Sequence, residues 1–275
     1  MPPRPWEEPQ DMGSLRRPKR YQAATTLRES LESFSFCCPL RYARGSKLPP
    51  VSDAVNVPTA ICEGQSFLSL NTYDRARFTF GFGQFAAHVP DGDFIRWFRD
   101  MLQRPEAIDY FPNLEVQGGR IVKVEEDKVV AMESRDSTDR LQMFFNPTLD
   151  EIEDAEVVGA AKLIHWTNNH PEVRLLQIQH MINTARRLVT EGDKRLGLDG
   201  RTADVCCIVM DVRHQGRAGF ADLQEALLAP KPFEALLEVG SAGEPERVRN
   251  LKAALGPRRA NLKKKKWSRS VGDFV

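Results

Sequence analysis

The chain has 275 residues, 41% of them hydrophobic and 28% charged, so it holds enough apolar material for a sizeable core and is not disordered throughout. Its 39 Lys and Arg residues nearly balance 38 Asp and Glu residues, so the whole chain offers no electrostatic attraction for nucleic acid or membranes. No run reaches the roughly 18 apolar residues of a spanning helix, and the N-terminus lacks the apolar centre of a signal peptide. We therefore expect a protein that is cytoplasmic as synthesised.

The cysteines and histidines indicate neither a disulfide framework nor a metal site. Five cysteines are an odd number, and two pairs are adjacent in sequence instead of following C-x-x-C spacing. The five histidines are dispersed and show no H-x-x-x-H pattern. We therefore predict reduced thiols, no metal and no cofactor.

The first part of the chain predicts a disordered segment followed by two helices. Residues 1–22 are rich in Pro, Arg and Glu without periodicity. A capping box of Thr26 and Glu29 favours a short helix over 25–36. After two prolines, a second helix is expected over 53–63.

The middle of the chain combines strands and helices. Alternating Phe with Thr and Gly over 78–83 has the period of two that is typical of a strand in a hairpin. Apolar residues over 91–102 return to helical spacing and end before a proline. Three further strands are expected at 114–117, 120–124 and 129–132. We interpret 105–147 as a β-rich insertion.

The second half predicts a succession of helices and then a basic tail. A possible capping box of Thr148 and Glu151 opens a helix that should run to about Trp166. Further helices are expected at 172–195, 198–212, 221–228 and 232–239, and the one over 198–212 is apolar nearly all round, like the central helix of a core. Residues 256–275 hold seven basic side chains and one acidic side chain. We therefore predict one domain over 23–245 and a separate basic C-terminal tail over 246–275.

Two carboxylic acids near the predicted hairpin, Glu63 and Asp74, have the properties needed for cleaving a glycosidic bond. That reaction needs an acid to protonate the leaving oxygen and usually a second carboxylate to hold water. Glu63 ends an apolar helix, and partial desolvation raises a carboxyl pKa toward the protonated form. Asp74 lies beside Arg75 and Arg77, which favour its ionised form. The sequence therefore offers Glu63 as acid and Asp74 as base.

The run EGQSFLSLNTYDRARFTFGFGQ, residues 63–84, resembles the active-site hairpin of phage-type lysozymes. In that family a Glu at a helix end is followed by an Asp in the turn and by a Thr that begins T-x-G-x-G, which Thr79, Gly81 and Gly83 match. The spacings of Asp74 and Thr79 from Glu63 are slightly longer than usual, so Asn71 competes with Asp74 as the residue that holds water. The resemblance implies that Thr79 helps to position that water.

A second stretch supports the same resemblance. DVCCIVMDVRHQGRAGFADLQEAL, residues 204–227, is similar to the central helix, glycine turn and following helix of the phage-type cleft, and its HQGR loop is similar to that of the helical chitosanases. The resemblance covers about 55–240, without a counterpart for 105–147. It implies a mostly helical α+β, lysozyme-like fold and a set of substrate-binding residues: Asn71, Tyr73, Phe82, Gln84, His214 and Arg217.

The expected function is a glycoside hydrolase that cleaves a β-1,4-linked amino-sugar polymer, most simply a muramidase that degrades peptidoglycan of the cell wall and acts as an antimicrobial. Such an enzyme would leave the cytoplasm by lysis or by a non-classical secretion route. Chitosanase and lytic transglycosylase reactions remain open on the same fold.

Several features also have simpler interpretations. Thr79 could be an outward strand residue, and Gly81 and Gly83 could serve a tight bend instead of a close approach of sugar. Trp97 is expected in the core. The alternative function is a non-catalytic module whose lysines at 263–266 contact an anionic polymer such as nucleic acid or teichoic acid.

Overall fold

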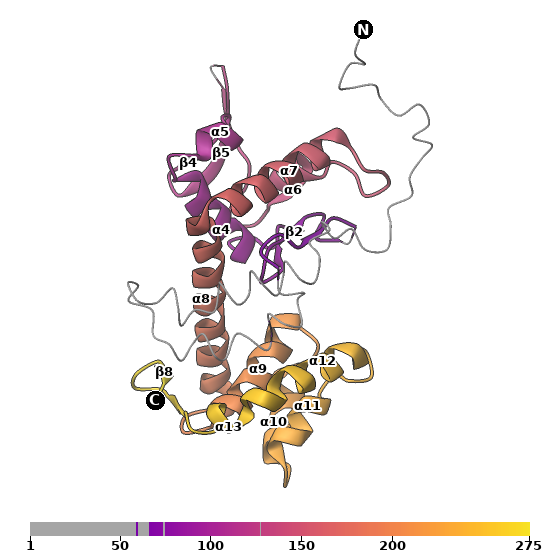
Figure 1. Cartoon of the computed structure of the whole chain (residues 1–275), viewed down its shortest axis with the longest axis vertical. Helices are drawn as coiled ribbons and strands as arrows, with labels where there is room; N and C mark the ends of the chain where they lie inside the picture. The colour runs from indigo at the N-terminus through magenta and orange to yellow at the C-terminus, as the bar shows by residue number, and fades with distance from the viewer. Residues whose placement is uncertain (1–58, 60–65, 74, 127) are drawn as a thin grey trace. The chain divides into compact units, whose positions relative to one another are not determined.

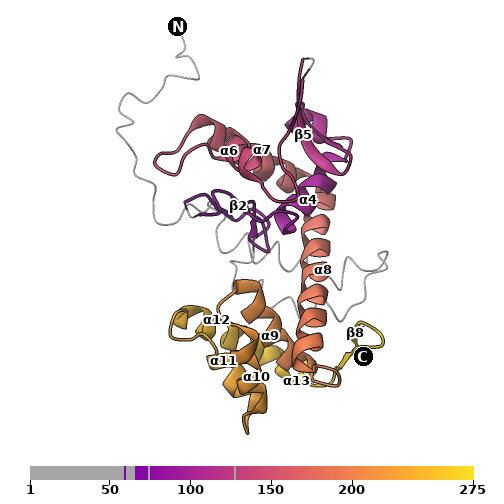
Figure 2. The ribbon, with the colours of Figure 1, turned by 180° about the vertical axis from the view of Figure 1, so that it is seen from behind.

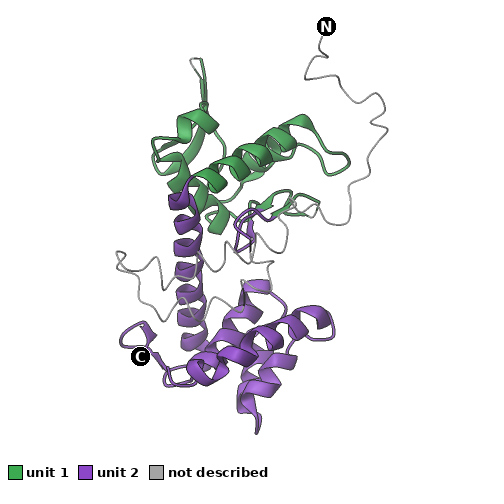
Figure 3. Ribbon diagram, viewed as in Figure 1, with its two compact units in different colours: residues 1–23, 70–79, 86–169 green, residues 24–69, 80–85, 170–275 purple. Residues whose placement is uncertain are grey.

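The computed structural model describes residue 59 and residues 66–73, 75–126 and 128–275, and these form a mixed α+β, mostly helical fold, as predicted (Figure 1). Glu63, Asp74 and the predicted helix over 25–36 lie outside the described residues. The helix predicted over 53–63 is described only at Thr59, which is helical. The single predicted domain divides into two compact units, one including 70–79 and 86–169, the other including 66–69, 80–85 and 170–275 (Figure 3).

The first unit is built around an aromatic core. Its helices are α4 (Asp93–Leu102), α5 (Ala107–Tyr110), α6 (Asp139–Phe145) and α7 (Asp154–Asn169). The predicted apolar face of α4 is buried, including Trp97, and Phe94 of that helix lies 5.7 Å from the ring of Phe145 on α6. The expectation that Trp97 is a core residue is confirmed.

The three strands predicted in the insertion are present. Strands β4 (Leu114–Gln117), β5 (Arg120–Glu125) and β6 (Lys128–Ala131) form an antiparallel sheet in that order. Gly118 and Gly119 both have positive φ, which suits the tight turn between β4 and β5. The insertion also contains α5 and α6, which the sequence pattern did not predict.

A buried carboxylate joins this sheet to α4. The Glu133 side chain is fully buried and accepts hydrogen bonds from Arg99 Nη2 at 2.7 Å, Arg120 Nη1 at 2.9 Å and the Ile121 backbone N–H at 3.0 Å. Because a buried charge is tolerated when it is paired and hydrogen-bonded, this network explains an acidic residue inside the unit.

The second unit contains α8 (Pro171–Leu196), α9 (Ala203–Gln215), α10 (Phe220–Leu228), α11 (Pro232–Glu238) and α12 (Pro245–Leu255). Pro171 occupies the first turn of α8, and Gly197 ends that helix in the left-handed region with φ 64°. All residues of α9 from Ala203 to Val212 are buried, which confirms the predicted central helix. Figures 1 and 2 show α9 to α13 gathered around one end of α8.

The predicted boundary before residue 246 is wrong, because the C-terminal segment belongs to the core of the second unit. After α12 follow η1 (Gly256–Arg258), α13 (Arg259–Leu262), β7 (Trp267–Ser268) and β8 (Asp273–Phe274). Apolar side chains between the basic ones are buried in the same core as α9: Leu251, Leu255, Leu262, Trp267 and Phe274. The sequence pattern did not predict their burial, because these apolar residues are widely spaced among many charged ones.

An ion pair holds the C-terminal segment against the end of α8. Arg269 donates from Nε and Nη2 to the buried Asp193 carboxylate, at 2.7 and 2.9 Å. Hydrogen bonds from Arg269 and from the Asp199 backbone N–H lower the pKa of Asp193 from 3.8 to about 2 despite burial. Since the folded pKa is depressed, this contact stabilises the fold above pH 3.8 and is lost as the pH falls through about 2.

The structure also bears on the cysteines, on membrane-spanning helices and on metal ligands. Cys206 and Cys207 are free thiols and are buried, and burial raises the pKa of Cys206. Over the described ranges, no helix is long and apolar enough to cross a membrane, and no cluster of three or more His, Cys, Asp or Glu residues is arranged to hold a metal. The other three cysteines lie outside the described residues.

Candidate functional site

The hairpin that carries T-x-G-x-G is formed by short strands. Strands β1 (Leu70–Asn71), β2 (Thr79–Phe80) and β3 (Phe85–Ala86) form a sheet in the order β1-β2-β3. Thr79 begins β2, and its side chain is buried, with 6% of the residue exposed. The predicted role of Thr79 in positioning water therefore concerns a residue with little surface accessible to solvent.

Gly81 allows a close approach that no other residue permits. Its φ is +85°, and a Cβ atom there would lie 2.5 Å from Oε1 of Gln177 on α8. Close packing against Gln177 therefore explains why a glycine stands here. This agrees with the interpretation that Gly81 serves a tight bend.

The side-chain amide of Gln177, on α8, forms hydrogen bonds to the hairpin turn through both its oxygen and its nitrogen. Its Oε1 accepts the backbone N–H of Phe82 at 2.9 Å, and its Nε2 donates to the backbone carbonyl of Phe67 at 3.1 Å. The side chain is fully buried, so these bonds satisfy a polar group that would otherwise be costly in the core. The turn is consequently held in one fixed position relative to α8.

Two predicted substrate-binding residues lie in this turn. The ring of Phe82 is buried and stacks on Phe67 with centroids 5.4 Å apart. The Gln84 Nε2 donates to the Gly81 carbonyl at 2.9 Å, and Gln84 itself has positive φ. In the described structure both side chains support the turn.

Two other predicted residues share a smaller turn in the first unit. The Asn71 Oδ1 accepts the backbone N–H of Tyr73 at 3.2 Å, which is an Asx-type turn. Tyr73 is 38% exposed, so its ring is accessible to solvent. Of the predicted aromatic residues, Tyr73 is therefore the one available for contact with a ligand.

His214 and Arg217 lie at the C-terminal end of α9, on either side of Gly216, which ends the helix with φ 67°. His214 is partly exposed. The Arg217 guanidinium turns inward instead, and its Nη2 donates to Asp211 Oδ2 at 3.0 Å with only 3% of the side chain exposed. The two predicted substrate-binding residues therefore differ in environment: His214 is partly exposed, whereas the Arg217 side chain is buried.

Asp211 is the centre of a buried cluster that the sequence interpretation missed. It is fully buried in α9, and besides Arg217 it accepts a hydrogen bond from Arg247 Nη2 on α12 at 2.6 Å. Thr59 Oγ1 donates to the same carboxylate at 2.9 Å. One signal was available: an acidic residue inside the apolar run VCCIVMDV must find buried partners.

Compared with known proteins, the chain matches no family model, no curated protein and no solved structure. The resemblance to phage-type lysozymes therefore depends on the two sequence stretches quoted above.

Proposed function

We propose that this protein is a glycoside hydrolase that cleaves a β-1,4-linked amino-sugar polymer, with peptidoglycan as the substrate. Glu63 is the proton donor in this proposal. Asp74 holds the attacking water, Thr79 helps to place it, and Asn71 is the competing residue for Asp74. The exposed Tyr73 and the partly exposed His214 are the side chains assigned to contact the glycan.

The hydrogen bond between Thr59 and Asp211 is the observation that carries this proposal. Thr59 precedes Glu63 by four positions, which is about one turn of the helix expected there. Asp211 belongs to α9, the helix singled out by the second stretch of the resemblance. The hydrogen bond thus joins the segment that leads into Glu63 to the second stretch of the resemblance, through a buried carboxylate at 2.9 Å.

The fixed hairpin turn adds support from another direction. An acid and a water-holding group must keep a set separation, and rigid placement of the supporting residues favours such precision. Gln177 ties the turn to α8, and Gly81 permits that contact. The T-x-G-x-G pattern therefore has a definite local geometry in this chain.

Product analysis tests the reaction. The purified chain is incubated with peptidoglycan, chitosan and β-glucans, the fragments are identified by mass spectrometry, and fresh reducing ends are followed by proton NMR. If Asp74 holds water, the carboxyl groups lie roughly 6.5–9.5 Å apart and the released anomer is inverted. A retained anomer, or an anhydro product without a reducing end, would contradict the roles given to Asp74 and Thr79.

The C-terminal lysines favour a second function, contact with an anionic polymer. Lys263, Lys264, Lys265 and Lys266 are all exposed. The segment is anchored by buried Leu262 and Trp267, and the Lys266 N–H donates to the Val275 carbonyl at 2.9 Å. The four charges are therefore displayed on a fixed support, which lowers the ordering cost of binding a polyanion.

Replacing the four lysines by Gln is expected to weaken binding to anionic walls or nucleic acid at low salt without changing cleavage of a small soluble oligosaccharide. The salt dependence of binding should become shallower, because fewer counterions are released. Sedimentation with walls at several salt concentrations measures this effect. Lys231→Gln/Lys252→Gln, at exposed positions elsewhere in the same unit, is the control. An unchanged salt slope in the quadruple variant would rule out the lysines.

A further inference from the structure

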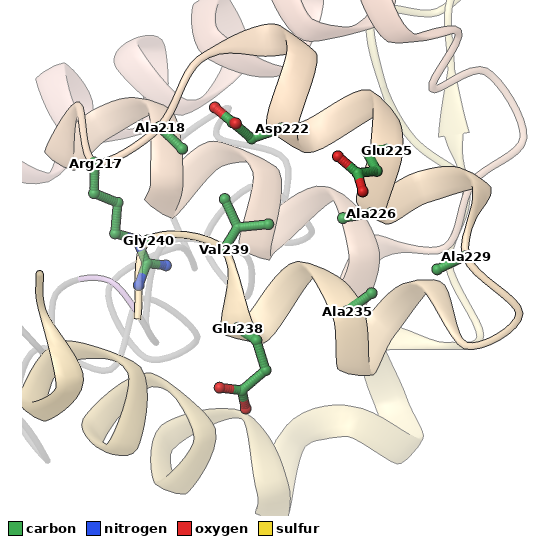
Figure 4. Close-up of a pocket in the computed structure, with 10 residues that line it drawn as sticks. All are labelled: Arg217, Ala218, Asp222, Glu225, Ala226, Ala229, Ala235, Glu238, Val239 and Gly240. Carbon is green, nitrogen blue, oxygen red and sulfur yellow. The ribbon is translucent and has the colours of Figure 1, made fainter. Parts of the chain in front are cut away.

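A groove of roughly 480 Å³ lies in the second unit, with α10 and α11 as its walls (Figure 4). Half of its ten lining residues carry small apolar side chains: Ala218, Ala226, Ala229, Ala235 and Val239. Because alanine side chains are short, the facing helices leave space between them that larger residues would fill. Leu228, the last residue of α10 and the chain neighbour of Ala229, is 74% exposed.

Carboxylates stand on both walls of this groove. Asp222 and Glu225 come from α10 and Glu238 from α11, as Figure 4 shows. Asp222 already accepts the backbone N–H of Gly219 at 2.9 Å, so it has a structural task at the start of α10. Glu225 and Glu238 are exposed, and Glu238 has only a long contact of 3.7 Å with the exposed Lys252.

The one cation in the lining is already engaged within the protein. Arg217 turns its guanidinium toward the buried Asp211 carboxylate. The groove therefore presents an apolar floor between acidic walls, and it repels anionic ligands such as phosphates or acidic glycans. Its charge is opposite to that of the exposed lysines Lys263–Lys266 in the same unit.

We propose that the groove docks a short basic peptide segment of a partner protein. A small apolar side chain of the segment lies over the alanines, while lysine or arginine side chains on either side reach Glu225 and Glu238. Negative charges on both facing walls select a ligand that is basic at both edges, and an open groove admits a chain that continues past its ends. This docking is independent of glycan cleavage.

The probe is a fluorescein-labelled peptide of sequence KAAKAAK, titrated with the full chain and followed by fluorescence anisotropy at low and physiological salt. The variant Glu225→Gln/Glu238→Gln is expected to raise the dissociation constant at least about fivefold, as for two charge pairs near the surface. The control, Glu191→Gln/Glu246→Gln, removes two exposed carboxylates elsewhere in the same unit and should bind like the parent.

A second variant separates the groove from the general charge of the surface. Ala229→Leu/Ala235→Leu fills the floor without altering any charge, and it is expected to lose binding by a similar factor. Equal losses in the control and groove variants, or full binding by the filled variant, would overturn the proposal. Tighter binding of a peptide copying residues 15–20, LRRPKR, would also overturn it, because the occupant would then be a segment of this chain.

Discussion

Glu63→Gln is expected to reduce glycan cleavage by about 10² to 10⁴-fold, the usual contribution of a general acid. The amide is nearly the same size as the carboxylic acid, but it cannot donate the proton that the leaving oxygen needs. Initial rates on peptidoglycan, or on whichever glycan the product analysis identifies, measure the loss. Thermal melting should stay close to that of the parent, because the substitution changes volume very little.

The matched control is Glu191→Gln, the same substitution at an exposed position on α8, where Glu191 pairs only with Arg187. This control should keep full activity. If the Glu63 variant is as active as the control and melts like the parent, Glu63 is not the acid, and the proposed mechanism fails at its central residue.

Asp211→Ala is expected to lower the free energy of unfolding by about 3–5 kcal/mol, the usual cost of removing one partner from a buried ion pair. The reason is that two guanidinium groups, of Arg217 and Arg247, are only 3% and 9% exposed and would lose the carboxylate they share. The hydroxyl of Thr59 would lose its acceptor as well. Urea unfolding followed by far-ultraviolet circular dichroism measures the change.

A surface ion pair in the same unit provides the comparison. Glu246 pairs with Arg249 on α12 at 2.9 Å, but both side chains are about 70% exposed. Glu246→Ala should therefore cost no more than about 1 kcal/mol. A cost for Asp211→Ala as small as that of Glu246→Ala would mean that the cluster tolerates the loss of its central carboxylate.

The helices that the sequence predicted well are those whose signals lie within a few residues of one another. The proline at the start of α8 and the glycines after α8 and α9 act on the local backbone, so their effect is visible in any short window. The β4–β5 turn is similar, because Gly118 and Gly119 by themselves favour the left-handed conformation it needs. The apolar periodicity of α4 likewise requires no knowledge of what covers it.

What the sequence by itself determined is therefore the class of fold and most of its elements, whereas the residues it offers for glycan cleavage stay a prediction. Only the tertiary structure decided which of those residues face inward. Arg217 turns to Asp211, and Phe82 stacks on Phe67, because each side chain has a buried partner that a local pattern does not specify. The C-terminal segment joins the core for the same reason: Trp267 and Phe274 are isolated in a charged sequence, and burying them needs a surface contributed by distant helices. Contacts of this kind depend on the closure of long loops, and only the folded chain brings such residues together.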